Sequence, residues 1–164
     1  MKRVNILLLV VIMVFFASCK QGLRSIMFDD GGVKADNRME QLLSTIVDKD
    51  REALKSLFSK KVLEEFDDID SGIDMLFEYL HGNIDSWERD GLSGGNTRRE
   101  GKITTMNRFN IIINTDKDVY EIFVMDYYTD TINPDNEGIY MLKVYKSSYS
   151  GEHNQSRAGI HIVE

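Results

Sequence analysis

The sequence predicts an α+β fold in which N-terminal helices pack on one face of a curved antiparallel sheet of about four strands. Apolar residues recur at helical spacing as far as Gly82, and beyond that point β-branched runs alternate with polar turns. Helices followed by strands in separate blocks are typical of this class. The 164 residues, 42% hydrophobic and 29% charged, provide enough chain and apolar surface for one globular domain.

The first 18 residues have the composition of a secretory signal. Lys2 and Arg3 give a positive start, residues 4–16 are apolar except for Asn5, and Ala17 and Ser18 are small. The uninterrupted apolar stretch, residues 6–17, is shorter than the roughly 20 residues that a transmembrane helix requires. We therefore expect a signal peptide over residues 1–18, not a permanent membrane span.

Cys19 is the only cysteine, which excludes an intrachain disulfide and a cysteine-based zinc site. The run Phe16-Ala17-Ser18-Cys19 resembles the bacterial lipobox. That resemblance implies transfer of diacylglycerol to Cys19, cleavage before it, and anchoring to a membrane of the bacterial cell envelope through acyl chains. An ordinary signal with an incidental cysteine is the alternative. Residues 19–34, with Gly31-Gly32, are expected to form a tether, and residues 35–164 a single α+β domain.

Four helical segments are expected after the tether. Asp36 is the predicted N-cap of the first, whose apolar positions lie at i, i+3 and i+4 spacing. Asp50 is predicted to cap the second helix, and Ser59 to begin a short third one. The last helix is expected to start near Ser71 and to end at Gly82.

The second half of the chain contains the predicted strands. Residues 88–99 are Gly-rich and polar, and they are expected to form a loop. The short connections between most of the other segments predict antiparallel neighbours. The expected strands are a short one at 84–87, longer ones at 103–114, 119–129 and 139–145, and a closing apolar segment at 160–163.

Several of these segments carry a resemblance to a known family. The run 50–59, the turn 114–116, residues 119–122 and residues 138–140, with the acceptor cysteine, look similar to a family of uncharacterised bacterial lipoproteins with a nuclear transport factor two-like, or cystatin-like, domain. The resemblance covers about residues 36–146. It implies a conical α+β shell with an internal pocket and no established activity. The short strand pair that many such domains carry between the second and third helices is not evident.

Motifs that would indicate a specific chemistry are incomplete. Residues 91–95 match G-x-S-x-G, but the serine lies in the expected loop without the strand and helix that a hydrolase elbow requires. Residues 133–138 resemble the start of an EF-hand loop, yet Val144 occupies the position of the bidentate glutamate. No two histidines are four residues apart among His81, His153 and His161. We therefore predict neither a metal nor a cofactor.

The remaining site candidates are residues expected to face a pocket. Asp126 lies between apolar neighbours in a strand and is a candidate general base if it is buried. His81 is a second weak catalytic candidate, although a histidine at a helix end also complements the helix dipole. Core packing is the alternative for all of the pocket candidates, which are Tyr79, Trp87, Tyr127, Tyr128 and Tyr140, with Met75, Met125 and Met141.

These features predict a non-catalytic module that binds a small apolar ligand or an envelope protein. The alternative is a pocket enzyme of the polyketide-cyclase or ketosteroid-isomerase type, using Asp126 or His81 with a tyrosine. A structural role, with the outer face of the sheet forming a dimer, is a third hypothesis. The formal net charge of −7 argues against nucleic-acid binding. The ligand, the membrane leaflet and the oligomeric state stay open at this point.

Overall fold

The computed structural model describes residues 30–66, 68–147 and 159–163. The expected signal peptide, Cys19, residues 20–29 of the expected tether and His153 lie outside these residues. The chain divides into two compact units, Met1–Lys34 and Ala35–Glu164, and the description below concerns the second, with residues 30–34 mentioned only as the start of its first helix. Within the described residues, no helix combines the length and the apolar character needed to cross a membrane.

The helices are α2 (Asp30–Asp48), α3 (Arg51–Ser56), α4 (Lys60–Glu65) and α5 (Ile69–Tyr79). The predicted caps of the second and third helices are confirmed. The Asp50 carboxylate accepts a hydrogen bond from the Ala53 N–H, and the Ser59 hydroxyl accepts one from the Val62 N–H. Each side chain satisfies a backbone donor that the first helical turn leaves without a partner.

The predicted starts of the other two helices are wrong. Helix α2 begins at Asp30, so residues 30–34 of the expected tether are helical. Asp36 lies inside this helix, and its carboxylate accepts a hydrogen bond from Arg89 Nε at 2.6 Å instead of capping the backbone. Helix α5 begins after Asp68, whose carboxylate accepts from the Ser71 N–H at 3.0 Å. The earlier start adds Ile69, which is buried, to the apolar face of α5.

The prediction of about four antiparallel strands is wrong, because the sheet has five strands and is mixed. The strand order is sequential and the sheet is not closed into a barrel. Strands β1 to β4 are antiparallel neighbours, whereas β5 runs parallel to β4. The longer connection after β4 lets the chain enter β5 in the same direction. The strands are β1 (Ile84–Arg99), β2 (Lys102–Thr115), β3 (Val119–Asp130), β4 (Gly138–Lys146) and β5 (Gly159–Val163).

Residues 88–99 form the second half of β1 and not the expected loop. They pair with β2 through a two-residue turn, Glu100-Gly101, in which both residues have positive φ, 52° and 79°. Positive φ at both central positions is typical of the type I′ turn, whose twist matches that of a hairpin. Residues 88–99 have a low intrinsic strand propensity, and pairing with β2 along the whole segment holds them in an extended conformation.

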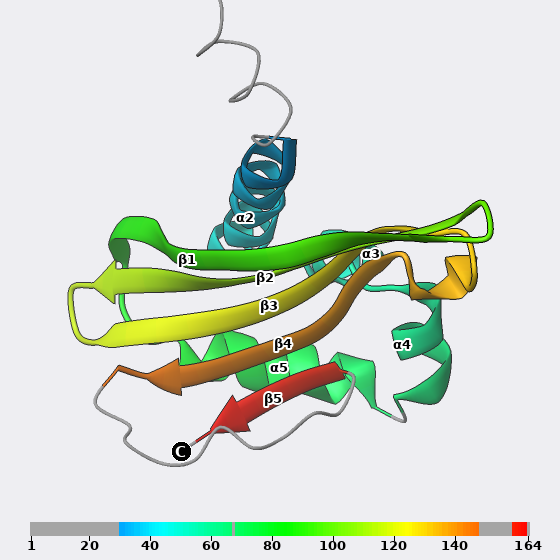
Figure 1. The fold of residues 1–164 in the computed structure, drawn as a ribbon. Helices are drawn as coiled ribbons and strands as arrows, with labels where there is room; N and C mark the ends of the chain where they lie inside the picture. The colour runs from blue at the N-terminus through cyan, green and yellow to red at the C-terminus, as the bar shows by residue number, and fades with distance from the viewer. Residues whose placement is uncertain (1–29, 67, 148–158, 164) are drawn as a thin grey trace, which may run out of the picture. The chain divides into compact units, whose positions relative to one another are not determined.

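The core lies between the helices and one face of the sheet, as Figure 1 shows for α5 behind the strands. Alternation along β2 and β3 directs one set of side chains to the helices, and these are almost fully buried. Strands β2 and β3 contribute Phe109, Ile111, Ile113, Tyr120, Ile122 and Val124 to this core, β4 and β5 contribute Ile139, Leu142, Val144 and Ile160, and the helix residues include Leu42, Leu54, Ile73 and Leu76.

Candidate functional site

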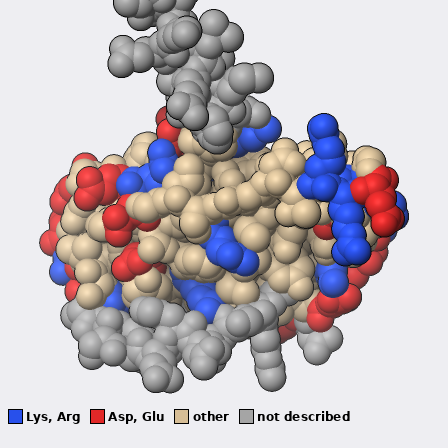
Figure 2. All heavy atoms as spheres, viewed as in Figure 1, with Lys and Arg blue, Asp and Glu red and all other residues tan. Residues whose placement is uncertain are grey.

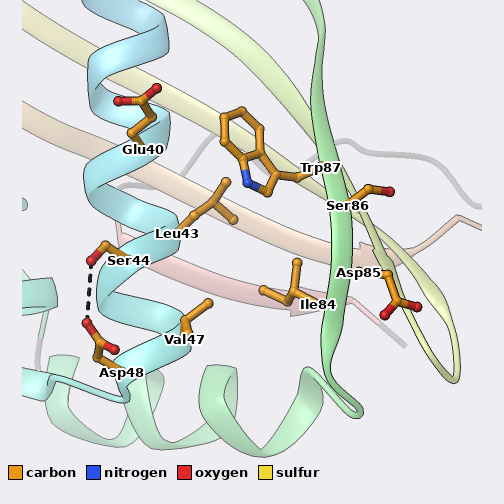
Figure 3. A pocket seen from close by; sticks show the side chains of 9 residues that line it. All are labelled: Glu40, Leu43, Ser44, Val47, Asp48, Ile84, Asp85, Ser86 and Trp87. Atoms are coloured by element: carbon orange, nitrogen blue, oxygen red, sulfur yellow. Dashed lines mark hydrogen bonds between the residues drawn. The ribbon is translucent and has the colours of Figure 1, made fainter.

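A groove of about 600 Å³ lies between the C-terminal half of α2 and the start of β1 (Figure 3). We call it the seam groove. Its lining residues are Glu40, Leu43, Ser44, Val47 and Asp48 from α2, and Ile84, Asp85, Ser86 and Trp87 from β1.

The centre of the seam groove is apolar. Leu43 and Val47 are four residues apart and therefore share one face of α2. Figure 3 shows both side chains on the side of α2 that faces β1, with Ile84 and Trp87 extending toward the helix. Val47 is 62% exposed and Trp87 39% exposed, so water reaches apolar surface that the fold has not buried.

The apolar surface continues beyond the groove. A second hollow of about 440 Å³ shares Val47 and Ile84 with the seam groove. Its other apolar lining comes from Ile46, Phe77, Leu80 and Ile113, so it extends toward the end of α5. The two hollows together therefore form one open, partly apolar depression along this side of the domain.

The edge of the seam groove is acidic. Its charged lining residues are Glu40, Asp48 and Asp85, and none of the nine lining residues is basic. The Ser44 hydroxyl donates a hydrogen bond to Asp48 Oδ2 at 3.4 Å, while Asp85 points away from α2 in Figure 3. The groove thus combines an apolar centre with negative charge at its margins.

A polar cluster is buried between α2 and the sheet, separately from the groove. Asp126 on β3 is fully buried, and Arg38 of α2 donates from Nε to its Oδ2 at 2.7 Å. The other carboxylate oxygen, Oδ1, accepts no hydrogen bond of normal geometry from the described residues. Asn107 lies opposite Asp126 on β2, and Tyr128 lies two residues further along β3. The structure therefore surrounds Asp126 with polar side chains, although its neighbours in the sequence are apolar.

Burial raises the pKa of the Asp126 carboxyl, because removing the charged form from water is costly. The Arg38 guanidinium opposes this shift through its charge and its hydrogen bond, and the nearby Tyr128 hydroxyl opposes it to a smaller degree. Burial and the Asp126 charge together raise the pKa of Tyr128 well above its usual value. Burying the charged carboxylate of Asp126 therefore destabilises the fold, and the ion pair with Arg38 offsets this effect.

The two weak catalytic candidates lie in different places. His81 is exposed beyond the end of α5, where its backbone N–H donates to the Tyr120 hydroxyl at 3.1 Å. Tyr120 and Asp126 are six residues apart on β3, which corresponds to roughly 20 Å. Asp126 lines none of the main hollows among the described residues.

The aromatic candidates do not line one common pocket but lie at several separate positions in the fold. Trp87 lines the seam groove and Tyr128 lies beside Asp126. Tyr79 contacts Tyr120 edge-to-face, with ring centroids 5.7 Å apart. A second edge-to-face pair, also at 5.7 Å, joins Tyr127 and Tyr140. Of the methionines, Met75 is exposed and Met141 is buried, while Met125 is half-buried.

Sequence reasoning had not identified Leu43, Val47, Ile84 or Arg38 as site residues. The first two belong to the apolar positions at i, i+3 and i+4 spacing in the first predicted helix, and Ile84 begins the short strand predicted at 84–87. A signal was available for Val47, since it lies at the margin of the apolar stripe of α2. No comparable signal exists for Arg38, whose partner is 88 positions away. Among the described residues, no group of three or more His, Cys, Asp or Glu is arranged to hold a metal ion.

The helices on one face of an open, five-stranded mixed sheet define the chain as a protein of the α+β class. Residues 41–147 match the model of the family described as "Domain of unknown function (DUF5104)", and the chain belongs to this family. The matched span includes most of the seam groove and Asp126 but begins after Arg38. No curated protein matches the sequence.

Proposed function

We propose that this chain is a bacterial cell-envelope lipoprotein whose domain is a non-catalytic binding module. Export and acylation at Cys19 are supported by the charged start, the apolar segment of limited length and the small residues before the single cysteine. A nuclear transport factor two-like, or cystatin-like, fold is supported by helices gathered on one face of long antiparallel strands. The mixed, open sheet is the feature that departs most from that expectation.

The observation that carries the binding function is the seam groove. Exposed apolar side chains that gather at one place on a surface mark a candidate interaction site, whereas scattered single ones are ordinary. Here Val47 is largely exposed and Trp87 partly exposed, beside the buried Leu43. The acidic margin disfavours an anionic ligand. The ligand class supported best is therefore a neutral or cationic molecule with an apolar body, or an apolar segment of an envelope protein.

The enzyme alternative has one observation in its favour, the buried Asp126 carboxyl, whose pKa is raised by burial. Strongly perturbed acids are common in active sites. A general base must nevertheless reach its substrate, and Asp126 is fully buried, bound to Arg38 and outside the main hollows. The geometry therefore supports binding more than catalysis.

Acylation is tested by mass spectrometry of the chain purified from its native bacterial membranes. We expect a mature chain that starts at Cys19 and carries acyl chains, and we expect the Cys19→Ser variant to retain its leader. An intact leader on the natural protein, or a mature chain without lipid, would remove the envelope anchor from this proposal.

The groove is tested through Trp87, which is the only tryptophan in the chain and therefore reports on this site alone. A neutral, hydrophobic naphthalene probe that accepts energy from tryptophan is titrated into the full chain in a nonionic detergent. We expect energy transfer from Trp87, with an affinity at least fivefold lower in Val47→Asp.

Ile132→Asp is the matched control, since Ile132 is 60% exposed and Val47 62% exposed. The control variant should bind the probe like the unmodified chain. Absence of energy transfer, or equal weakening in both variants, would count against the seam groove as the binding site.

A further inference from the structure

The distal half of the β1–β2 hairpin, residues 92–108, carries four basic side chains and one acidic one in a chain of net charge −7. We call this segment the basic arm. Its basic residues are Arg98, Arg99, Lys102 and Arg108, and all four are exposed. Figure 2 shows Lys and Arg gathered at the end of the domain where Figure 1 places the β1–β2 turn.

The strand register places three of these cations on one face. Arg99 lies opposite Lys102, and Arg108 lies opposite Ser93 at an even spacing along β2. Paired residues share a face, and residues two apart on a strand return to it. This face is the one turned away from the helices, because Asn107 and Phe109, on the opposite side of β2, are buried. The basic arm thus has a stripe of positive charge on the outer face of the sheet.

Among the described residues, no carboxylate forms an ion pair with this stripe. The ion pairs between described side chains involve other basic residues, namely Arg38, Arg51, Lys55, Lys60, Arg89 and Lys146. Like charges directly opposite each other on neighbouring strands destabilise a hairpin. Arg99 and Lys102 form such a pair beside the turn, so an anionic partner would relieve a repulsion that the folded arm contains.

The composition of the arm indicates what kind of partner fits. No aromatic residue occurs between positions 92 and 108, and the residues beside the cations are mainly Gly, Ser, Thr and Asn. Protein–protein interfaces concentrate aromatic and other apolar side chains at their centre. A polar, basic ribbon lacks that centre, whereas it matches a surface of diffuse negative charge such as a layer of anionic lipid headgroups.

We infer that the outer face of the basic arm, with Arg99, Lys102 and Arg108, contacts the anionic phospholipid headgroups of the membrane to which Cys19 is attached. This inference rests on the proposed lipid attachment, which keeps the domain near the bilayer. Each basic side chain near an anionic surface strengthens membrane association about fivefold. Three such side chains on one face therefore raise the equilibrium constant for association of the arm with the membrane by about two orders of magnitude at low ionic strength.

The test uses the full acylated chain with Thr97→Cys, which places a thiol on the same face as Arg99. Acylation blocks Cys19, so a fluorescent donor reacts at position 97 alone. The labelled chain is reconstituted into phosphatidylcholine vesicles with or without phosphatidylglycerol, and energy transfer to an acceptor on lipid headgroups is measured. We expect stronger transfer on the anionic vesicles and its loss at about 0.5 M salt, where the Debye length is below about 5 Å.

Arg99→Gln/Lys102→Gln should weaken the preference for anionic vesicles about 25-fold and leave only the contribution of Arg108. Lys49→Gln/Lys117→Gln is the matched control, because it removes the same charge at exposed positions elsewhere and should leave the preference intact. If the chain stays on the vesicles but energy transfer is equal with and without phosphatidylglycerol, the inference about the basic arm is overturned, while the lipid attachment still stands. A chain that takes up two labels and leaves the vesicles would instead overturn the lipid attachment.

Discussion

Replacing Arg38 by methionine tests whether the buried carboxylate of Asp126 depends on its single ionic partner. The substitution keeps an unbranched side chain but removes the Nε donor that lies 2.7 Å from Asp126 Oδ2. Asp126 is fully buried and Arg38 is only 19% exposed on its side chain, so solvent compensates little. Removing one partner of a buried pair typically costs about 3–5 kcal/mol. We expect a loss of this size at pH 7.

The loss should depend on pH in a defined direction. Burial raises the folded-state pKa of Asp126 above its ordinary value of 3.8, so the folded protein holds this proton more tightly than the unfolded chain does. Stability from such a group is greatest in acid and decreases as pH rises through the folded-state pKa. In Arg38→Met the guanidinium that lowers the pKa of Asp126 is missing, so this pKa should be higher in the variant. The decrease in stability with rising pH should therefore continue to a higher pH than in the unmodified chain. The variant should therefore approach the unmodified chain near pH 4.

Urea denaturation followed by circular dichroism at acidic and neutral pH measures the effect. Arg38→Met/Asp126→Asn is the control, because a neutral amide removes the uncompensated charge and should restore a large part of the lost stability. A free energy of unfolding for Arg38→Met that is independent of pH, or that rises with pH, would refute this account of the cluster.

Three further predictions compare positions within the described residues. A Cβ at Gly94 would lie 2.2 Å from the side-chain oxygen opposite it on β2 and 2.6 Å from a backbone oxygen, so Gly94→Ala should cost about 1–3 kcal/mol. Gly95→Ala meets nothing within 4 Å and should change stability by less than about 0.5 kcal/mol in the same urea titration. Leu76→Ala, in the core, should cost about 2–5 kcal/mol, whereas its neighbour Met75, 53% exposed, should tolerate alanine; equal losses would contradict the assigned faces of α5. Asp50→Ala removes the cap of α3 and should lower stability by about 1 kcal/mol, and an unchanged midpoint of thermal unfolding would argue that this cap contributes nothing.

The parts of the fold that the sequence predicts are those in which local chemistry and tertiary packing agree. Asp50 and Ser59 were identified as caps because each precedes an apolar helical pattern, and β2 to β4 were identified from their β-branched runs. The second half of β1 was missed because its Gly, Ser and Asn residues favour a loop. Its extended conformation comes from pairing with β2, and the turn at Glu100-Gly101 was the only local sign of a hairpin.

The candidate site was harder to predict, because it joins elements that are distant in the chain. Trp87 was named as a pocket residue, but its partners Leu43 and Val47 precede it by about forty positions and look like ordinary helix core. Asp126 was also named, yet nothing in its surroundings indicates that Arg38 would reach it from α2. Pairings of this kind depend on how α2 crosses the sheet, which periodicity alone does not specify.

The parallel placement of β5 has a consequence for how the domain assembles. Its glycine, Gly159, is tightly packed against Phe66, where a Cβ would come within 2.4 Å of the ring, and Ile160 is packed against α5. The edge of β4 from Met141 to Tyr145 therefore has unpaired backbone donors and acceptors whenever β5 is not docked. A chain that ends before residue 159 would keep this edge unpaired and would offer other copies a template for intermolecular pairing.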